Sequence, residues 1–150
     1  MKAVVQRVRW AEVCVEGQSV GRVEQGLLVY VGVGLGDTVP HAQRLAEKVA
    51  GLRIFADDND KMNLSCQDVR GGVLAVSNFT LLADTRKGRR PGFEAAAPSD
   101  EAERLYEAFA DALATQRCTV QRGVFRAKMT VRSAAAGPIN VLVDVPPPAE

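Results

Sequence analysis

Two apolar segments restrict the fold of this chain more than any other feature. One reads GLLVYVGVG over residues 26–34, and the other covers residues 73–82 after a pair of glycines. Runs of strand length that are apolar at successive positions, rather than at alternate ones, are typical of strands buried on both faces. We therefore predict that 26–34 and 73–82 are central strands of a sheet.

Two other segments carry apolar residues at helical spacing. In the first, Thr38 or Asp37 can cap the helix and Pro40 suits its first turn. In the second, Ser99 is the predicted N-cap and is followed by acidic residues. The predicted buried faces consist of Ala42, Leu45, Ala46 and Val49, and of Ala102, Leu105, Tyr106, Phe109 and Leu113.

The remaining strands are expected near both ends of the chain. Residues 1–17 suggest two short strands, with Gly17 and Gly21 marking hairpin turns, and three more strands are expected at 118–124, 127–133 and 139–145. The order strands, helix, strand, helix, strands predicts an α/β fold, with a mixed sheet or two sheets covered by two helices. The length suits a single domain over 1–145, with a frayed tail at 146–150.

Charge and cysteine content exclude several classes of protein. The net charge of +1 argues against a protein that binds nucleic acid through bulk positive charge. A local exception is RKGRR at 86–90, which is either a solvated loop or a phosphate contact. Cys14, Cys66 and Cys118 are widely spaced, which favours free thiols over a zinc or redox motif.

The N-terminal region lacks the pattern of a secretion signal. Arg7 and Arg9 stand where a signal peptide needs an apolar run, and no apolar segment approaches the ~20 residues that span a bilayer. We expect a cytoplasmic protein without a membrane partner.

Few side chains could carry ordinary hydrolytic catalysis. The single histidine, His41, lies at a predicted helix start and is expected to be solvated, which argues against a Ser-His-Asp or Cys-His site. The acidic stretch at 57–68 lacks the glycine and the glutamate of a calcium loop. Ser77, Asn78 and Thr80 interrupt an apolar strand, and either a hydrogen-bonded strand end or a pocket would explain them.

The dipeptide Gly137-Pro138 precedes the last predicted strand. From the residues alone it is either the start of a strand, where proline is tolerated, or a special backbone feature. The base rate of a cis bond before proline is only about 5–6%, and nothing local raises it.

Several stretches together resemble the bacterial D-aminoacyl-tRNA deacylases, also called D-Tyr-tRNA deacylases, over nearly the whole chain. They include LRIFADDNDKMNLS at 52–65, VSNFTLLADTRKGRRPGF at 76–93, and GVFRAKMTV and GPI near the end. The family signature Ser-Gln-Phe-Thr-Leu stands here as Ser77-Asn78-Phe79-Thr80-Leu81. The second signature, Asn-x-Gly-Pro-x-Thr, keeps Gly137-Pro138 but has Ala135, Ala136 and Asn140 around it, and Lys128 stands where the family usually has an acid.

This resemblance implies strongly twisted, barrel-like, layered sheets with two helices, and a homodimer. It implies hydrolysis of the ester that joins a D-amino acid to the 3′-terminal adenosine of tRNA, and also of glycyl esters on tRNA-Ala, without cofactor or metal. The implied catalytic segment is Ser77, Asn78, Phe79 and Thr80, whose backbone N–H groups would stabilise an oxyanion while the ribose 2′-OH activates water.

The resemblance also implies how substrates are bound and selected. A cis Gly137-Pro138 bond, braced by Arg7, would enter the partner subunit's site and exclude L-amino acids, while Phe125 and Met129 would line the adenosine pocket. Because the signature residues differ, two alternatives stay open: a paralogue with altered specificity, and a dimeric tRNA-binding module without catalysis.

Overall fold

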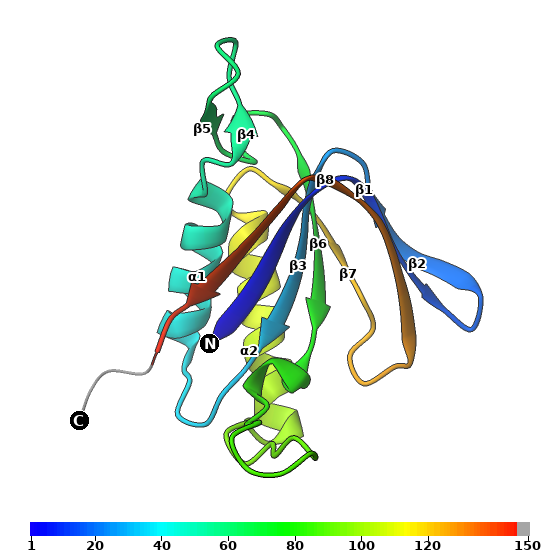
Figure 1. Cartoon of the computed structure of the whole chain (residues 1–150), viewed down its shortest axis with the longest axis vertical. Coiled ribbons are helices and arrows are strands. Elements are labelled where there is room, and N and C mark those ends of the chain that lie inside the picture. Colours follow the sequence, from blue (N-terminus) through cyan, green and yellow to red (C-terminus); the bar gives the residue numbers. More distant parts are fainter. Residues whose placement is uncertain (147–150) are drawn as a thin grey trace.

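The computed structural model describes residues 1–146, and in it two helices cover one face of a strongly curved, barrel-like mixed sheet (Figure 1). The predicted α/β class is therefore confirmed. The frayed tail expected at 146–150 lies, from residue 147 onward, outside the described residues. The elements are β1 (Lys2–Val15), β2 (Gln18–Val23), β3 (Gly26–Gly32), α1 (Val39–Gly51), β4 (Phe55–Ala56), β5 (Met62–Leu64), β6 (Gly72–Ser77), the 3₁₀ helix η1 (Phe79–Leu82), α2 (Ser99–Ala114), β7 (Thr119–Arg122) and β8 (Met129–Asp144).

The main sheet has the order β2-β1-β3-β6-β7, and β8 pairs with β1 on the side away from β3. The pairs β3–β6 and β6–β7 are parallel, whereas β1 runs antiparallel to β2, β3 and β8. As predicted, β3 and β6 are central, but the strand expected at 73–82 ends at Ser77, and Phe79–Leu82 forms η1 instead. Strands β3 and β6 end at the same edge of the sheet because they are parallel, and the structure beyond that edge forms the site described below.

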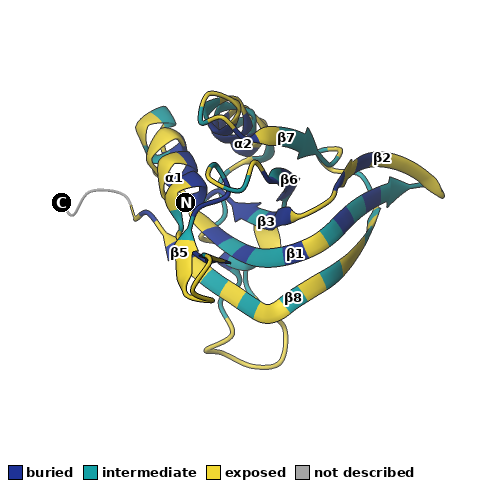
Figure 2. Cartoon of the chain, turned by 90° about the horizontal axis from the view of Figure 1, so that it is seen from above, coloured by how far each residue is buried: buried dark blue, intermediate teal, exposed yellow. Residues whose placement is uncertain are grey.

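Two hydrophobic clusters explain why the central strands are apolar at successive positions. Leu27, Val29 and Val31 of β3 face the cluster that also contains the buried sides of α1 and α2. Leu28 faces a second cluster, formed where β1 and β8 curve over the other face of the sheet. Figure 2 shows this curvature, with β8 outermost and largely exposed.

Two strand predictions near the termini are wrong. Residues 2–15 form one long strand rather than two short ones, because β1 pairs with β3 along its first half and with β2 along its second half. Likewise, the strands predicted at 127–133 and 139–145 are parts of the single strand β8, which pairs with β1 on both sides of Gly137-Pro138. The dipeptide therefore interrupts a strand instead of starting one.

The helix starts are close to those predicted. Thr38 caps α1, and the ring Nδ1 of His41 accepts the Thr38 backbone N–H at 2.9 Å, so the single histidine has a structural partner. For α2 the N-cap is Pro98, and the predicted cap, Ser99, is the first helical residue. The Ser99 hydroxyl therefore does not cap the helix, and it accepts a hydrogen bond from Arg126 instead.

Asp37 joins the N-terminus to the turn before α1. Its carboxylate is 2.7 Å from the Met1 ammonium and also accepts the Gly34 N–H at 2.6 Å, and both members of the ion pair are buried. Removing one partner of a buried pair leaves the other charge uncompensated.

We therefore expect Asp37→Asn to lower the free energy of unfolding by about 2–3 kcal/mol, measured by urea denaturation. The matched control is Asp144→Asn, which removes an exposed ion pair with Lys2 and should change stability by no more than ~0.5 kcal/mol. Equal losses in the two variants would contradict the role given to Asp37.

Candidate active site

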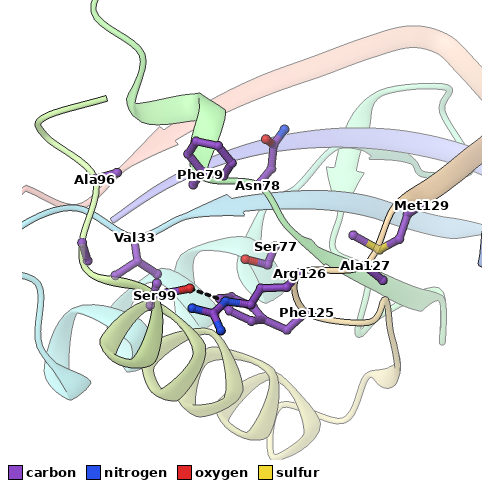
Figure 3. A pocket seen from close by; sticks show the side chains of 12 residues that line it. Val33, Ser77, Asn78, Phe79, Ala96, Ser99, Phe125, Arg126, Ala127 and Met129 are labelled. Carbon is purple, nitrogen blue, oxygen red and sulfur yellow. Dashed lines mark hydrogen bonds between the residues drawn. The ribbon is translucent and has the colours of Figure 1, made fainter. Parts of the chain in front are cut away.

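A cavity of 520 Å³ opens at the carboxyl ends of β3 and β6. In Figure 3 its walls come from η1, the loop before α2, the start of α2 and the connection between β7 and β8. Carboxyl ends of parallel strands are a common place for ligand sites, because the chain leaves the sheet there in loops that diverge. The volume lies within the range of small-molecule pockets.

The signature segment forms one wall of this pocket. Asn78 continues β6 by donating its backbone N–H to the Val31 carbonyl at 2.8 Å, and the chain then turns into η1. The Asn78 side-chain oxygen accepts both the backbone N–H and the hydroxyl of Thr80. Within residues 1–146, the backbone N–H of Phe79 has no acceptor, so it remains available to a ligand.

Aromatic and apolar side chains line most of the cavity. The Phe79 ring is 56% exposed and is held from one side by Phe93, with ring centroids 5.0 Å apart in an edge-on arrangement. On the opposite side, Phe125 packs against Tyr106 and faces the cavity with Met129. The remaining apolar walls are Val33, Ala96, Ala97, Ala102 and Ala127.

Tyr106, which lies behind Phe125, is a structural residue. Its hydroxyl donates to the Ala75 carbonyl at 2.8 Å in the core, and burial raises the pKa of Tyr106 to about 12. It therefore stays protonated at neutral pH and is not placed to act as a base for a ligand in the cavity.

Two polar residues of the cavity were not predicted from the sequence. Ser99 lies at the start of α2, and Arg126 lies in the connection before β8 and donates its Nε–H to the Ser99 hydroxyl at 2.6 Å (Figure 3). Arg126 is the only charged side chain among the described lining residues. The departure from the family pattern in this stretch is at Lys128, so nothing in the sequence marks Arg126, and only the fold reveals its position.

Gly137 and Pro138 lie elsewhere. Both residues are exposed, and the peptide bond between them is cis. In the pairing of β1 with β8, Gln6 pairs with Asn140 and Val8 pairs with Ala135. Residues 136–139 therefore form a bulge opposite the single residue Arg7. Arg7 donates to the Ala136 carbonyl at 3.3 Å and to the Ile54 carbonyl at 2.7 Å. The acceptor at position 136 is the backbone carbonyl, so this hydrogen bond does not depend on which side chain stands there.

The register of the strands shows that this bulge and the cavity lie at different positions along the sheet. Arg7 pairs with Leu27, at the start of β3, whereas Ser77 pairs with Val31, at its end. Four strand residues correspond to about 13 Å. Arg7 and Ala136 line a second hollow of 410 Å³ with Phe55.

The structure thus brings five of the predicted site residues to one cavity: Ser77, Asn78, Phe79, Phe125 and Met129. Thr80 is exposed on η1 and does not line the cavity. Arg7, Gly137 and Pro138 form a separate group on the same chain.

The basic loop follows η1. Arg86 is paired with Asp84, which holds the pKa of that carboxyl below its usual range, whereas Lys87, Arg89 and Arg90 are exposed and form no ion pair within the described residues. The loop is closed by two hydrogen bonds between the backbones of Asp84 and Gly92. Its cations are therefore presented to solvent beside the segment that lines the cavity.

Residues 1–146 contain no cluster of three or more His, Cys, Asp or Glu that could bind a metal ion. Of the three free thiols, Cys66 and Cys118 are buried and Cys14 is half-buried. None of the helices in this part of the chain has the length and apolar character needed to cross a membrane.

Comparison with known proteins gives a consistent result. A sequence model of the D-Tyr-tRNA(Tyr) deacylase family matches residues 4–144. Two similar proteins, both named D-aminoacyl-tRNA deacylase, come from Koribacter versatilis, 52% identical over 96% of this chain and 97% of that protein, and from Thermotoga petrophila, 51% identical with the same coverage.

Solved structures agree in fold. A protein described as a c-Myc DNA unwinding element binding protein has a TM-score of 0.92 at 34% identity, covering 97% of this chain and 99% of that one. A probable eukaryotic D-amino acid tRNA deacylase has a TM-score of 0.82 at 17% identity, covering 96% and 98% of the two chains, which supports the fold alone.

Proposed function

This chain belongs to the D-Tyr-tRNA(Tyr) deacylase family, and from this premise we propose that its cavity holds the 3′-terminal adenosine of an aminoacyl-tRNA. Its enzymatic activity is D-aminoacyl-tRNA deacylation, the hydrolysis of the ester between a D-amino acid and tRNA. The observation that carries the proposal is the free backbone N–H of Phe79 at the wall of an aromatic cavity.

The lining suits a nucleoside. Phe79, braced by Phe93, offers an exposed ring to a base, and stacking of a base on an aromatic side chain contributes about 1–3 kcal/mol. Phe125 and Met129 would confine the base from the opposite side, and the small alanines leave room for the ribose.

Backbone groups would stabilise the transition state. The Phe79 N–H would donate to the developing oxyanion, a contribution of about 3–4 kcal/mol for one donor in other enzymes. The Thr80 N–H already donates to the side-chain oxygen of Asn78. The backbone N–H of Phe79 is therefore the donor proposed for the oxyanion. Asn78 would hold η1 in place, and the Ser77 hydroxyl would contact the ester group from the same wall.

The substrate would supply its own base. No His, Asp, Glu or Cys is among the described residues that line the cavity. Activation of water therefore falls to the ribose 2′-OH, which lies next to the esterified 3′-OH.

Thr80→Ala tests whether a side-chain hydroxyl takes part. The variant keeps the backbone N–H that Asn78 accepts and loses one hydrogen bond, so deacylation of D-Tyr-tRNA should fall by less than about tenfold. Complete loss of turnover in a variant with an unchanged melting temperature would instead indicate catalysis by the threonine.

Handedness would be read by Gly137-Pro138 from a second subunit. The dipeptide is exposed and held by Arg7, yet it lies about 13 Å along the sheet from the cavity of its own chain. A homodimer in which each bulge enters the partner's cavity would place two backbone carbonyls against the α-carbon and leave no room for an L side chain. A monomer found by light scattering at micromolar protein concentration would contradict this arrangement.

Exclusion of this kind would not reject glycine, which has no side chain, so glycyl-tRNA, including glycine mischarged on tRNA-Ala, is a proposed second substrate. A role in the proofreading of translation would be carried out in the cytoplasm, which is the proposed location.

Purified protein incubated with D-Tyr-tRNA, Gly-tRNA and L-Tyr-tRNA tests the proposal. We expect release of D-tyrosine and glycine and no release of L-tyrosine. Release of L-tyrosine would favour a paralogue of different specificity, and tRNA binding without release of any amino acid would favour a non-catalytic module.

A further inference from the structure

Arg126 has a backbone conformation that arginine seldom adopts. Its φ is 66°, in the left-handed region that favours glycine, and it shares this with Glu16, Asp60, Arg70 and Arg117. Of these five, only Arg126 lines the cavity of the proposed active site. Unfavourable backbone conformations often persist at functional sites, which makes this residue a candidate for a role in binding.

The guanidinium of Arg126 is oriented but not neutralised. Its Nε–H donates to the Ser99 hydroxyl at 2.6 Å, which holds the side chain at the rim of the cavity. Its two terminal nitrogens have no hydrogen-bond or ion-pair partner in residues 1–146. Asp100 and Glu101 follow Ser99, but neither pairs with Arg126. The described lining therefore carries one positive charge, with two donor nitrogens free for a ligand.

The chemistry of the proposed substrate leaves one partner for this charge. The adenine and ribose are neutral, the carboxyl group of the amino acid is consumed in the ester, and the α-amino group is itself positive. The anion closest to the nucleoside is the phosphate on its 5′-oxygen, which joins it to the preceding nucleotide. Arginine suits a phosphate because its planar group can donate two parallel hydrogen bonds.

We propose that Arg126, positioned by Ser99, binds the 5′-phosphate of the terminal adenosine and thereby fixes the register of the tRNA 3′ end in the cavity. This inference rests on the proposed function, since it assumes that the cavity holds that nucleoside. Lys128, two residues further along the chain, is exposed and does not line the cavity, so it is not part of the proposed contact.

The test compares adenosine with adenosine 5′-monophosphate as ligands, by calorimetry, in the wild type and in Arg126→Gly. Glycine adopts this backbone conformation readily, so the variant should be at least as heat-stable as the wild type. We expect the monophosphate to bind the wild type about tenfold more tightly than adenosine, as for one charge-assisted hydrogen bond. In Arg126→Gly the two ligands should bind alike, with adenosine affinity unchanged.

Arg117→Gly is the matched control. Arg117 is exposed, has a φ of 59° and lies outside the cavity, so its variant should keep the preference for the monophosphate. With D-Tyr-tRNA as substrate, Arg126→Gly should raise KM about tenfold and leave kcat unchanged.

The outcomes separate this inference from the function on which it rests. If Arg126→Gly still prefers the monophosphate, the role of Arg126 is overturned while adenosine binding in the cavity stands. If neither ligand binds the wild type, although the enzyme deacylates D-Tyr-tRNA, the nucleoside cavity and the inference both fail.

Discussion

Deacylation of a D-Tyr-tRNA that ends in 2′-deoxyadenosine should be about 1,000-fold slower than deacylation of the natural substrate. The described cavity lining offers hydroxyls, an amide and one arginine, but no His, Asp, Glu or Cys that could take a proton from water. With the 2′-OH removed, neither the substrate nor these residues would supply a base. The fall should appear in kcat, because base stacking and phosphate contact do not need the 2′-OH.

Single-turnover kinetics on matched tRNAs, charged through the same 3′-ester, measure this effect. A competition experiment with the uncharged 2′-deoxy tRNA controls for binding, which should be unchanged. A 2′-deoxy substrate that is cleaved at the normal rate would show that the 2′-OH does not activate the water, and it would contradict this account.

Replacement of Gly137 by alanine should lower kcat/KM for D-Tyr-tRNA about 100-fold, the size of effect expected when a positioning group shifts by about 1 Å. Gly137 has a φ of 119°, and an added Cβ would lie 2.8 Å from Cγ1 of Ile139 and 2.9 Å from its backbone nitrogen. The Cβ would also approach the Arg7 guanidinium at 3.2 Å. The bulge must therefore move, and with it the two carbonyls proposed to face the α-carbon.

Gly17→Ala is the control for the loss of stability that alanine causes in any left-handed backbone conformation. Gly17 has a φ of 76°, but a Cβ there meets nothing within 4 Å, and it lies in the turn between β1 and β2. This variant should lose some stability and keep its activity. Full activity of Gly137→Ala in a folded protein would mean that the bulge takes no part in the reaction.

The central strands and both helices could be predicted because local pattern and burial agree there. Residues 26–34 are apolar at successive positions, and the structure buries them between two clusters. The single strand β8 could not be predicted in this way. Glycine and proline usually end strands, and only the partner strand β1, pairing on both sides of Arg7, shows that the ladder resumes after the bulge.

The site residues also fall into two groups: those that a local sequence pattern marks and those that only the fold reveals. Ser77, Asn78 and Thr80 interrupt an apolar run, so a pattern marks the segment around Phe79 directly. Arg126 carries no such mark, because its importance depends on Ser99, which is 27 residues away in sequence, and on a backbone conformation that arginine rarely shows. Similarly, only strand register reveals that Gly137 and Phe79 lie far apart on one chain.

The most direct test of this account is a crystal structure with D-tyrosyl-3′-aminoadenosine, in which a stable amide replaces the ester. We predict the adenine on Phe79, the tyrosyl carbonyl oxygen at the Phe79 N–H, and the α-carbon facing Gly137-Pro138 of a second copy of the chain. A complex with the ligand outside this cavity, or with the α-carbon enclosed by one chain alone, would contradict the account.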